Sequence, residues 1–141
     1  MKIIAKLCLL FTLASMTLIF YTFMYVNEPI TEALLFSLMV SSPLILLCLG
    51  VILFDYVGQP LKKTFLYYIT LGSFIGCLYF NIDFNLMMLF DAINKGSMGP
   101  AQGYWLLILV FGGPKPISIG GIIGFIIYFC LSNKTANKKL N

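Results

Sequence analysis

The sequence predicts an all-α integral membrane protein with four transmembrane helices. Of its 141 residues, 60 % are hydrophobic and 10 % are charged, whereas soluble domains have about 45–50 % and about 25 %. Four runs of apolar residues are long enough to cross a bilayer, and seven of the nine lysines fall on one side of the resulting arrangement. We therefore expect a single polytopic domain over residues 1–141, embedded in lipid.

Each predicted span is an uncharged run of roughly the 20 apolar residues that a membrane-crossing helix needs. The expected spans are approximately 7–27, 33–54, 64–80 and 117–133. The first run follows Lys2 and Lys6, as a secretory signal would. It is longer than the roughly 7–15 apolar residues of such a signal, so we interpret it as a retained anchor.

The placement of lysines predicts that both termini face the cytoplasm, where lysine near helix ends accumulates. One side of the four-helix arrangement holds Lys2, Lys6, Lys62, Lys63, Lys134, Lys138 and Lys139. The other side holds Glu28, Glu32, Asp83 and Asp91 against Lys95 and Lys115. Abundant Lys, Asn, Ile and Phe without any Arg suggests an AT-rich bacterial genome, so we expect a bacterial inner (plasma) membrane.

The long connection over 81–116 predicts a short amphipathic helix outside the membrane. Apolar residues follow the i, i+3, i+4, i+7 pattern of one helix face, and polar residues gather on the opposite face. The apolar set is Leu86, Leu89, Phe90 and Ile93, and the polar set is Asp83, Asp91, Asn94 and Lys95. Lying flat on the extracytoplasmic surface, this helix would present its charges to a partner. Candidate partner-binding residues are Asp83, Asp91 and Lys95, with Tyr104 and Trp105 at the headgroup level.

Two pairs of glycines mark where helices can approach closely. Gly72 and Gly76 in the third span, and Gly120 and Gly124 in the fourth, have the G-x-x-x-G spacing that lets two backbones meet. We expect the two faces to pack on each other, with homodimerisation as the alternative. Pro43 is expected to kink the second span, where neighbouring serine hydroxyls can bind the freed carbonyls.

Lys115 separates two ways of threading the last part of the chain. In one, the octet 104–111 dips into the outer leaflet, the fourth helix begins near Pro116, and Lys115 stays at the interface. In the other, 104–131 is one broken helix that places Lys115 inside the bilayer, as at transporter substrate sites. Asp55, at the end of the second span, is either paired with Lys62 or Lys63 or acts as a proton-coupling acid.

The residue inventory argues against catalysis, cofactors and metals. Histidine is absent, which removes most general-base and metal-ligand schemes. The acids predicted on opposite sides of the membrane cannot form a catalytic pair. Four scattered cysteines, Cys8, Cys48, Cys77 and Cys130, form no C-x-x-C pair and are interpreted as small packing residues. A formal net charge of +4 is too small and scattered for a nucleic-acid surface.

Two classes of function remain. The first is a non-enzymatic interaction protein that binds a partner through its outer loop or within the membrane, as an accessory subunit or an immunity-type protein. Its plan of four helices, inside termini and a large outer loop resembles that of immunity proteins for pore-forming bacteriocins, although no motif carries the likeness. The alternative is a minimal oligomeric transporter or channel, with Lys115 and Asp55 as candidate transport residues.

Overall fold

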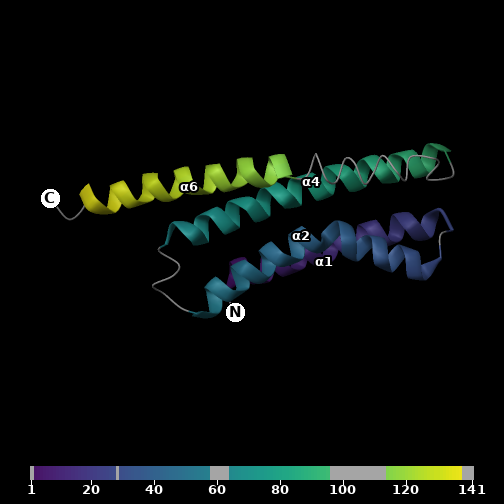
Figure 1. Ribbon diagram of the computed structural model, residues 1–141, viewed down its shortest axis with the longest axis horizontal. Helices are drawn as coiled ribbons and strands as arrows, with labels where there is room; N and C mark the ends of the chain where they lie inside the picture. The colour runs from purple at the N-terminus through teal and green to yellow at the C-terminus, as the bar shows by residue number, and fades with distance from the viewer. Residues whose placement is uncertain (1, 28, 58–63, 96–113, 138–141) are drawn as a thin grey trace.

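The computed structural model describes residues 2–27, 29–57, 64–95 and 114–137, and these residues form four helices (Figure 1). The helices are α1 (Ile3–Tyr25), α2 (Ile30–Val57), α4 (Phe65–Lys95) and α6 (Pro114–Asn137). Each contains a stretch long and apolar enough to cross a membrane. The prediction of an all-helical fold with four candidate spans is confirmed for the described part of the chain.

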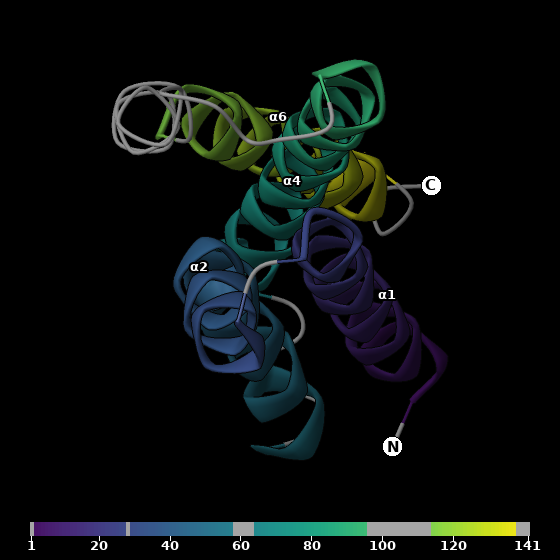
Figure 2. The same ribbon diagram turned by 90° about the vertical axis from the view of Figure 1, so that its right-hand side faces the viewer.

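The helices form a bundle of three with a fourth helix on one side. α1 and α2 make a hairpin, and α4 packs against both of them. α6 lies on the other side of α4 and contacts chiefly that helix (Figure 2). The first residues of α1 and the last residues of α6 lie toward the same end of the bundle (Figure 1).

The turn between α1 and α2 depends on Asn27. Its φ of 60° lies in the left-handed region, which asparagine tolerates better than most residues. Its N–H donates to the carbonyl of Met24 at 3.1 Å, which closes the last turn of α1. Pro29 then accepts a 3.0 Å hydrogen bond from the N–H of Ala33, so α2 starts immediately after the turn.

Pro43 lies inside α2 without ending the helix. Proline has no N–H, so the carbonyl of Met39, four residues earlier, loses its usual donor. The hydroxyl of Ser42 donates to that carbonyl at 2.9 Å. A serine next to the proline therefore replaces the missing hydrogen bond.

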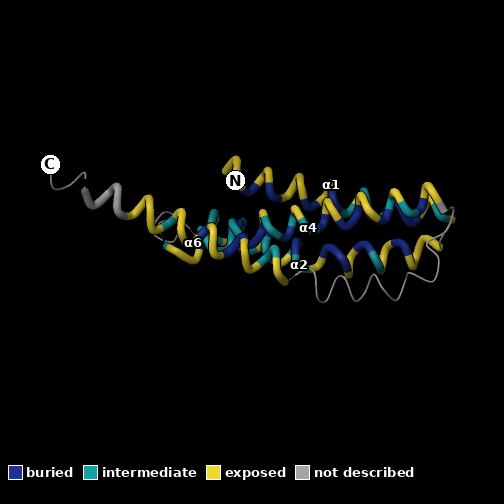
Figure 3. Tube along the Cα trace, turned by 90° about the horizontal axis from the view of Figure 1, so that it is seen from above, coloured by how far each residue is buried: buried dark blue, intermediate teal, exposed yellow. Residues whose placement is uncertain are grey.

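The core consists of two apolar clusters stacked along the bundle. The first cluster contains Ile19, Phe23, Ala33, Val40, Phe84 and Met88. The second contains Cys8, Leu44, Cys48, Val51, Tyr67, Phe74 and Cys77. Large apolar side chains are exposed on all four helices, as expected for surfaces that meet lipid. Figure 3 shows exposed residues recurring along the outer sides of the helices.

The third helix is longer than the sequence analysis predicted. Instead of stopping at Phe80, α4 continues to Lys95 as one helix of 31 residues. The span 64–80 expected from the sequence ends just before the polar residues Asn81 and Asp83. No glycine or proline occurs between Cys77 and Lys95, so nothing local interrupts the helix. The separate amphipathic helix expected after residue 81 is instead the second half of α4.

The stripe of α4 that packs in the core is not the apolar stripe that the sequence predicts for the membrane surface. The apolar stripe of Leu86, Phe90 and Ile93 is exposed. The buried stripe of this half-helix is Asn81, Phe84, Asn85, Met88 and Ala92. Packing against α1 and α2 thus selects a face on which two asparagines accompany the apolar residues.

Candidate functional site

The four glycines predicted to mediate helix packing lie at the contact between α4 and α6. A Cβ on Gly72 or Gly120 would clash with the carbonyl oxygen of the other residue. A Cβ on Gly76 would meet the carbonyl of Pro116, and one on Gly124 the carbonyl of Tyr68. The two helices therefore run antiparallel with their backbones in contact, at a spacing that only glycine permits.

Asp55 lies at the end of α2, next to the start of α1. Its Oδ2 accepts a hydrogen bond from the backbone N–H of Lys2 at 2.7 Å. A carboxylate at a helix N-terminus is stabilised by the free N–H groups and by the helix dipole. Asp55 thus connects the two helices at this end. The lysine partners predicted from the sequence, Lys62 and Lys63, lie outside the described residues.

Asp83 lies on the same side of α4 as the contact with α6, but farther along the helix. It follows Gly72 by eleven residues and Gly76 by seven, which are close to whole numbers of helical turns. The contact with α6 ends where Pro116 meets Gly76, so Asp83 lies about 10 Å beyond it. Its side chain is exposed.

Asp91 does not share a face with Asp83. Eight residues separate the two acids, which turns the side chains by about 80° and moves them about 12 Å along the axis. Asp91 is half-buried and engaged in an interaction, whereas Asp83 is exposed. The two acids therefore differ in exposure and in direction, and their shared role in binding a partner stays a prediction.

Lys115 lies in the first turn of α6 and is exposed. Its neighbour Pro116 touches Gly76, so Lys115 is level with the interior of α4 rather than with an end of that helix. The interfacial threading expected it at the membrane surface. The segment that distinguishes the two threadings, 104–111, lies outside the described residues, as do Tyr104, Trp105 and the side chain of Lys95.

Two asparagines buried inside the bundle are the feature that sequence analysis missed. Asn81 is 2 % exposed and Asn85 is 1 % exposed. The amide of Asn81 donates to the carbonyl of Cys77 at 3.1 Å, but its Oδ1 has no partner within the described chain. The absence of glycine and proline between Cys77 and Lys95 could have shown that both residues continue the helix, but it does not show which face is buried.

Three of the cysteines are buried in the second apolar cluster, and Cys130 is exposed on α6. All four are free thiols. The parts of the chain that the structure describes contain no group of three His, Cys, Asp or Glu side chains that could hold a metal ion.

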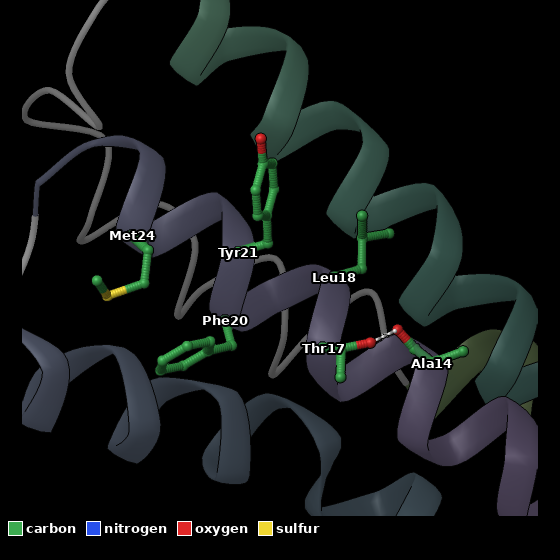
Figure 4. A pocket seen from close by; sticks show the side chains of 6 residues that line it. All are labelled: Ala14, Thr17, Leu18, Phe20, Tyr21 and Met24. Atoms are coloured by element: carbon green, nitrogen blue, oxygen red, sulfur yellow. Dashed lines mark hydrogen bonds between the residues drawn. The ribbon is translucent and has the colours of Figure 1, made fainter.

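The hollows on the described surface are open and apolar. One, of about 500 Å³, lies on α1 and is lined by Ala14, Thr17, Leu18, Phe20, Tyr21 and Met24 (Figure 4). The hydroxyl of Thr17 donates to the carbonyl of Ala14 at 2.9 Å, within its own helix. A second hollow, of about 490 Å³, follows the contact between α4 and α6. Neither gathers the convergent polar groups typical of a site for a polar substrate.

These features indicate a multi-pass membrane protein with four candidate spanning helices, of which α4 carries two buried asparagines. Comparisons with protein-family models, with curated proteins and with solved structures found no match.

Proposed function

We propose that the chain is a non-enzymatic, multi-pass protein of a bacterial inner membrane that binds a protein partner, with Asp83 as a contact residue. An accessory subunit and an immunity-type protein are two forms of this role. The observation that carries the proposal is the exposed carboxylate of Asp83 on the stretch of α4 beyond its contact with α6. The proposed partner contact is on the side of a helix and not in an outer loop, because α4 continues through these residues.

The depth of Asp83 in the bundle explains why it needs a partner. Its neighbour Phe84 packs in one cluster with Ile19 and Val40. Those residues lie about 9 Å from the end of α1 and about 15 Å from the start of α2. In a membrane crossed by α1 and α2, Asp83 therefore lies at the depth of the hydrocarbon.

A carboxylate at that depth is unfavourable unless a cation is near. Insertion scales give about 2.5–3.5 kcal/mol for a charged residue at the centre of a spanning helix. Lysine or arginine in a transmembrane segment of the partner would offset this cost. We therefore propose that the partner carries a basic residue within its own span.

The proposed orientation places both termini in the cytoplasm. It is supported by the lysines at the start of the chain, between α2 and α4, and in the tail. It is also supported by the shared end of the bundle toward which α1 begins and α6 finishes (Figure 1).

The experiment is site-specific photo-crosslinking in cells. A photoreactive amino acid at Leu86, which is exposed and one turn from Asp83, should capture the partner for identification by mass spectrometry. Asp83→Asn should reduce the yield, and Asp83→Lys should abolish it, because like charges at such a contact cost several kcal/mol. An acidic substitution of the partner's basic residue should then restore the crosslink to Asp83→Lys.

Glu32 provides the matched control, since it is an exposed acid near the start of α2. Glu32→Gln and Glu32→Lys should leave the crosslink unchanged. The proposal fails if the crosslinked product is equally abundant with Asp, Asn and Lys at position 83.

A minimal oligomeric transporter is the second candidate, favoured by the position of Lys115. A helix that begins with a charged residue level with the interior of its neighbour is the arrangement found at broken helices in transporters. Asp55, which binds the N-terminus of α1, is engaged in a structural contact and is the weaker transport candidate. This function requires transport by the purified protein in vesicles and its loss in Lys115→Ala.

A further inference from the structure

Five buried polar atoms, contributed by three helices, have no hydrogen-bond partner within the described chain. They are Ser15 Oγ of α1, Ser41 Oγ of α2, and Asn81 Oδ1, Asn85 Oδ1 and Asn85 Nδ2 of α4. None of the four residues is more than 4 % exposed. Buried polar atoms are almost always paired, so five together require an explanation.

Ser15, Ser41 and Asn81 lie between the two apolar clusters along their helices, and Asn85 lies one turn from Asn81, beside Phe84 of the first cluster. Ile19, Val40 and Phe84 pack together in the first cluster. Ser15 is one helical turn from Ile19, Ser41 follows Val40, and Asn81 and Asn85 flank Phe84. At 1.5 Å per residue, all four fall within about 6 Å of that contact along the axis. The second cluster, with Cys8, Leu44 and Cys77, lies beyond them. We call these four residues the polar layer.

The backbone does not satisfy the polar layer. Other buried hydroxyls of the same helices bond to the preceding turn: Thr12 to the carbonyl of Cys8 at 2.7 Å, and Thr22 to that of Leu18 at 2.9 Å. Ser15 and Ser41 make no such bond, although a helix offers it to every serine. The amide of Asn85 likewise leaves both its donor and its acceptor unused.

We propose that the polar layer is a binding site for ordered water inside the three-helix core. The layer offers both kinds of group, since hydroxyls and the Asn85 amide nitrogen donate while the amide and hydroxyl oxygens accept. Water can serve both, and a buried water typically makes about three hydrogen bonds to polar groups that otherwise have no partner. Such water would bridge α1, α2 and α4 at the level where the two apolar clusters meet.

A bound cation fits the layer less well. The side chains of the layer are neutral, so none of them supplies negative charge to balance an ion. The nearest acid in sequence, Asp83, is exposed on the outside of α4. Hard cations in proteins usually have carboxylates among their oxygen ligands.

X-ray hydroxyl-radical footprinting of the protein in lipid nanodiscs tests this site, because radicals formed from bound water oxidise the side chains beside it. Met88 is one turn from Asn85 and 1 % exposed, whereas Met87 points outward into lipid. We expect rapid oxidation of Met88 and little of Met87. Asn85→Leu and the milder Ser41→Ala should each lower the oxidation rate of Met88 several-fold.

Thr22→Val is the matched control, since it removes a buried hydroxyl that already has a partner. It should leave the oxidation of Met88 unchanged. Two results would overturn the proposal. If Met88 is as protected as Met87, the layer holds no ordered water. If replacing sodium with choline lowers the unfolding temperature of the wild type but not of Asn85→Leu, the layer binds a cation.

Discussion

Replacing Gly120 with alanine tests whether backbone contact holds α6 on α4. A Cβ at this position would be driven into the carbonyl oxygen of Gly72, and backbone atoms cannot rotate away as a side chain can. The helices must therefore separate at the crossing. The change adds a single methyl group and slightly raises helix propensity, so any loss of stability must come from packing.

The size of the effect follows from how closely the helices are packed. Inserting a methyl group into a tight contact costs typically about 1–3 kcal/mol. A separation of only 0.5–1 Å already forfeits about a quarter to a half of the dispersion attraction between facing atoms. Because α6 packs chiefly on α4, little other contact compensates. Since 1.4 kcal/mol is a factor of ten, the population with α6 detached should rise about 5- to 150-fold.

Equilibrium unfolding in detergent measures this loss. The expected result is that Gly120→Ala lowers the free energy of unfolding by about 1–3 kcal/mol.

Gly121→Ala is the matched control at the adjacent residue. A Cβ there would meet Ser73 Oγ at 2.9 Å and Ile69 Cγ2 at 3.6 Å, and both are side-chain atoms that can move. Its free energy of unfolding should change far less. If the two variants lose equal stability, contact between the glycine backbones does not determine the stability of this pair of helices.

Three further predictions concern other ends of the bundle. Asp55→Ala should lower the free energy of unfolding by about 0.5–2 kcal/mol, because it removes the acceptor for the N–H of Lys2. Asp55→Asn should lower it by less, and thermal unfolding in detergent measures both. Single cysteines at Ser97 and Asn137 should label from opposite faces of the membrane, and labelling of both from outside would refute the four-span orientation. Lys115→Cys should be protected from a membrane-impermeant thiol reagent if α6 begins inside the bilayer, whereas ready labelling from outside would restore the interfacial threading.

The number and type of the helices could be predicted from the sequence because spans are set by length and charge. Uncharged runs of the required length give four spans, and these coincide with four helices in the structure. Their ends were less predictable. α2 continues past Phe54 to Val57 and α4 past Phe80 to Lys95, because helix termination depends on local hydrogen bonds and packing rather than on hydropathy.

Of the candidate site, the sequence predicts only the contact between the glycine pairs, because it depends on residue spacing within single helices. The spacing of Gly72 with Gly76, and of Gly120 with Gly124, indicates a close contact whatever the rest of the fold does. The surroundings of Asn81, Asp83 and Asn85 depend instead on which face of α4 meets α1 and α2. Hydrophobic periodicity pointed to the stripe with Leu86 and Phe90, which suits lipid as well as it suits a protein core, so the pattern alone could not choose between them.

That ambiguity is specific to membrane proteins and bears on function. In water, burying the most apolar stripe of a helix lowers the free energy, whereas in lipid that stripe is already in an apolar solvent. Helices then gain more by turning small or polar residues toward one another, as Gly72, Asn81 and Asn85 do in α4. A polar residue left facing outward at the same depth, such as Asp83, gains nothing from the fold itself. The exposed position of Asp83 on a candidate spanning helix is therefore the reason that we propose a partner contact there.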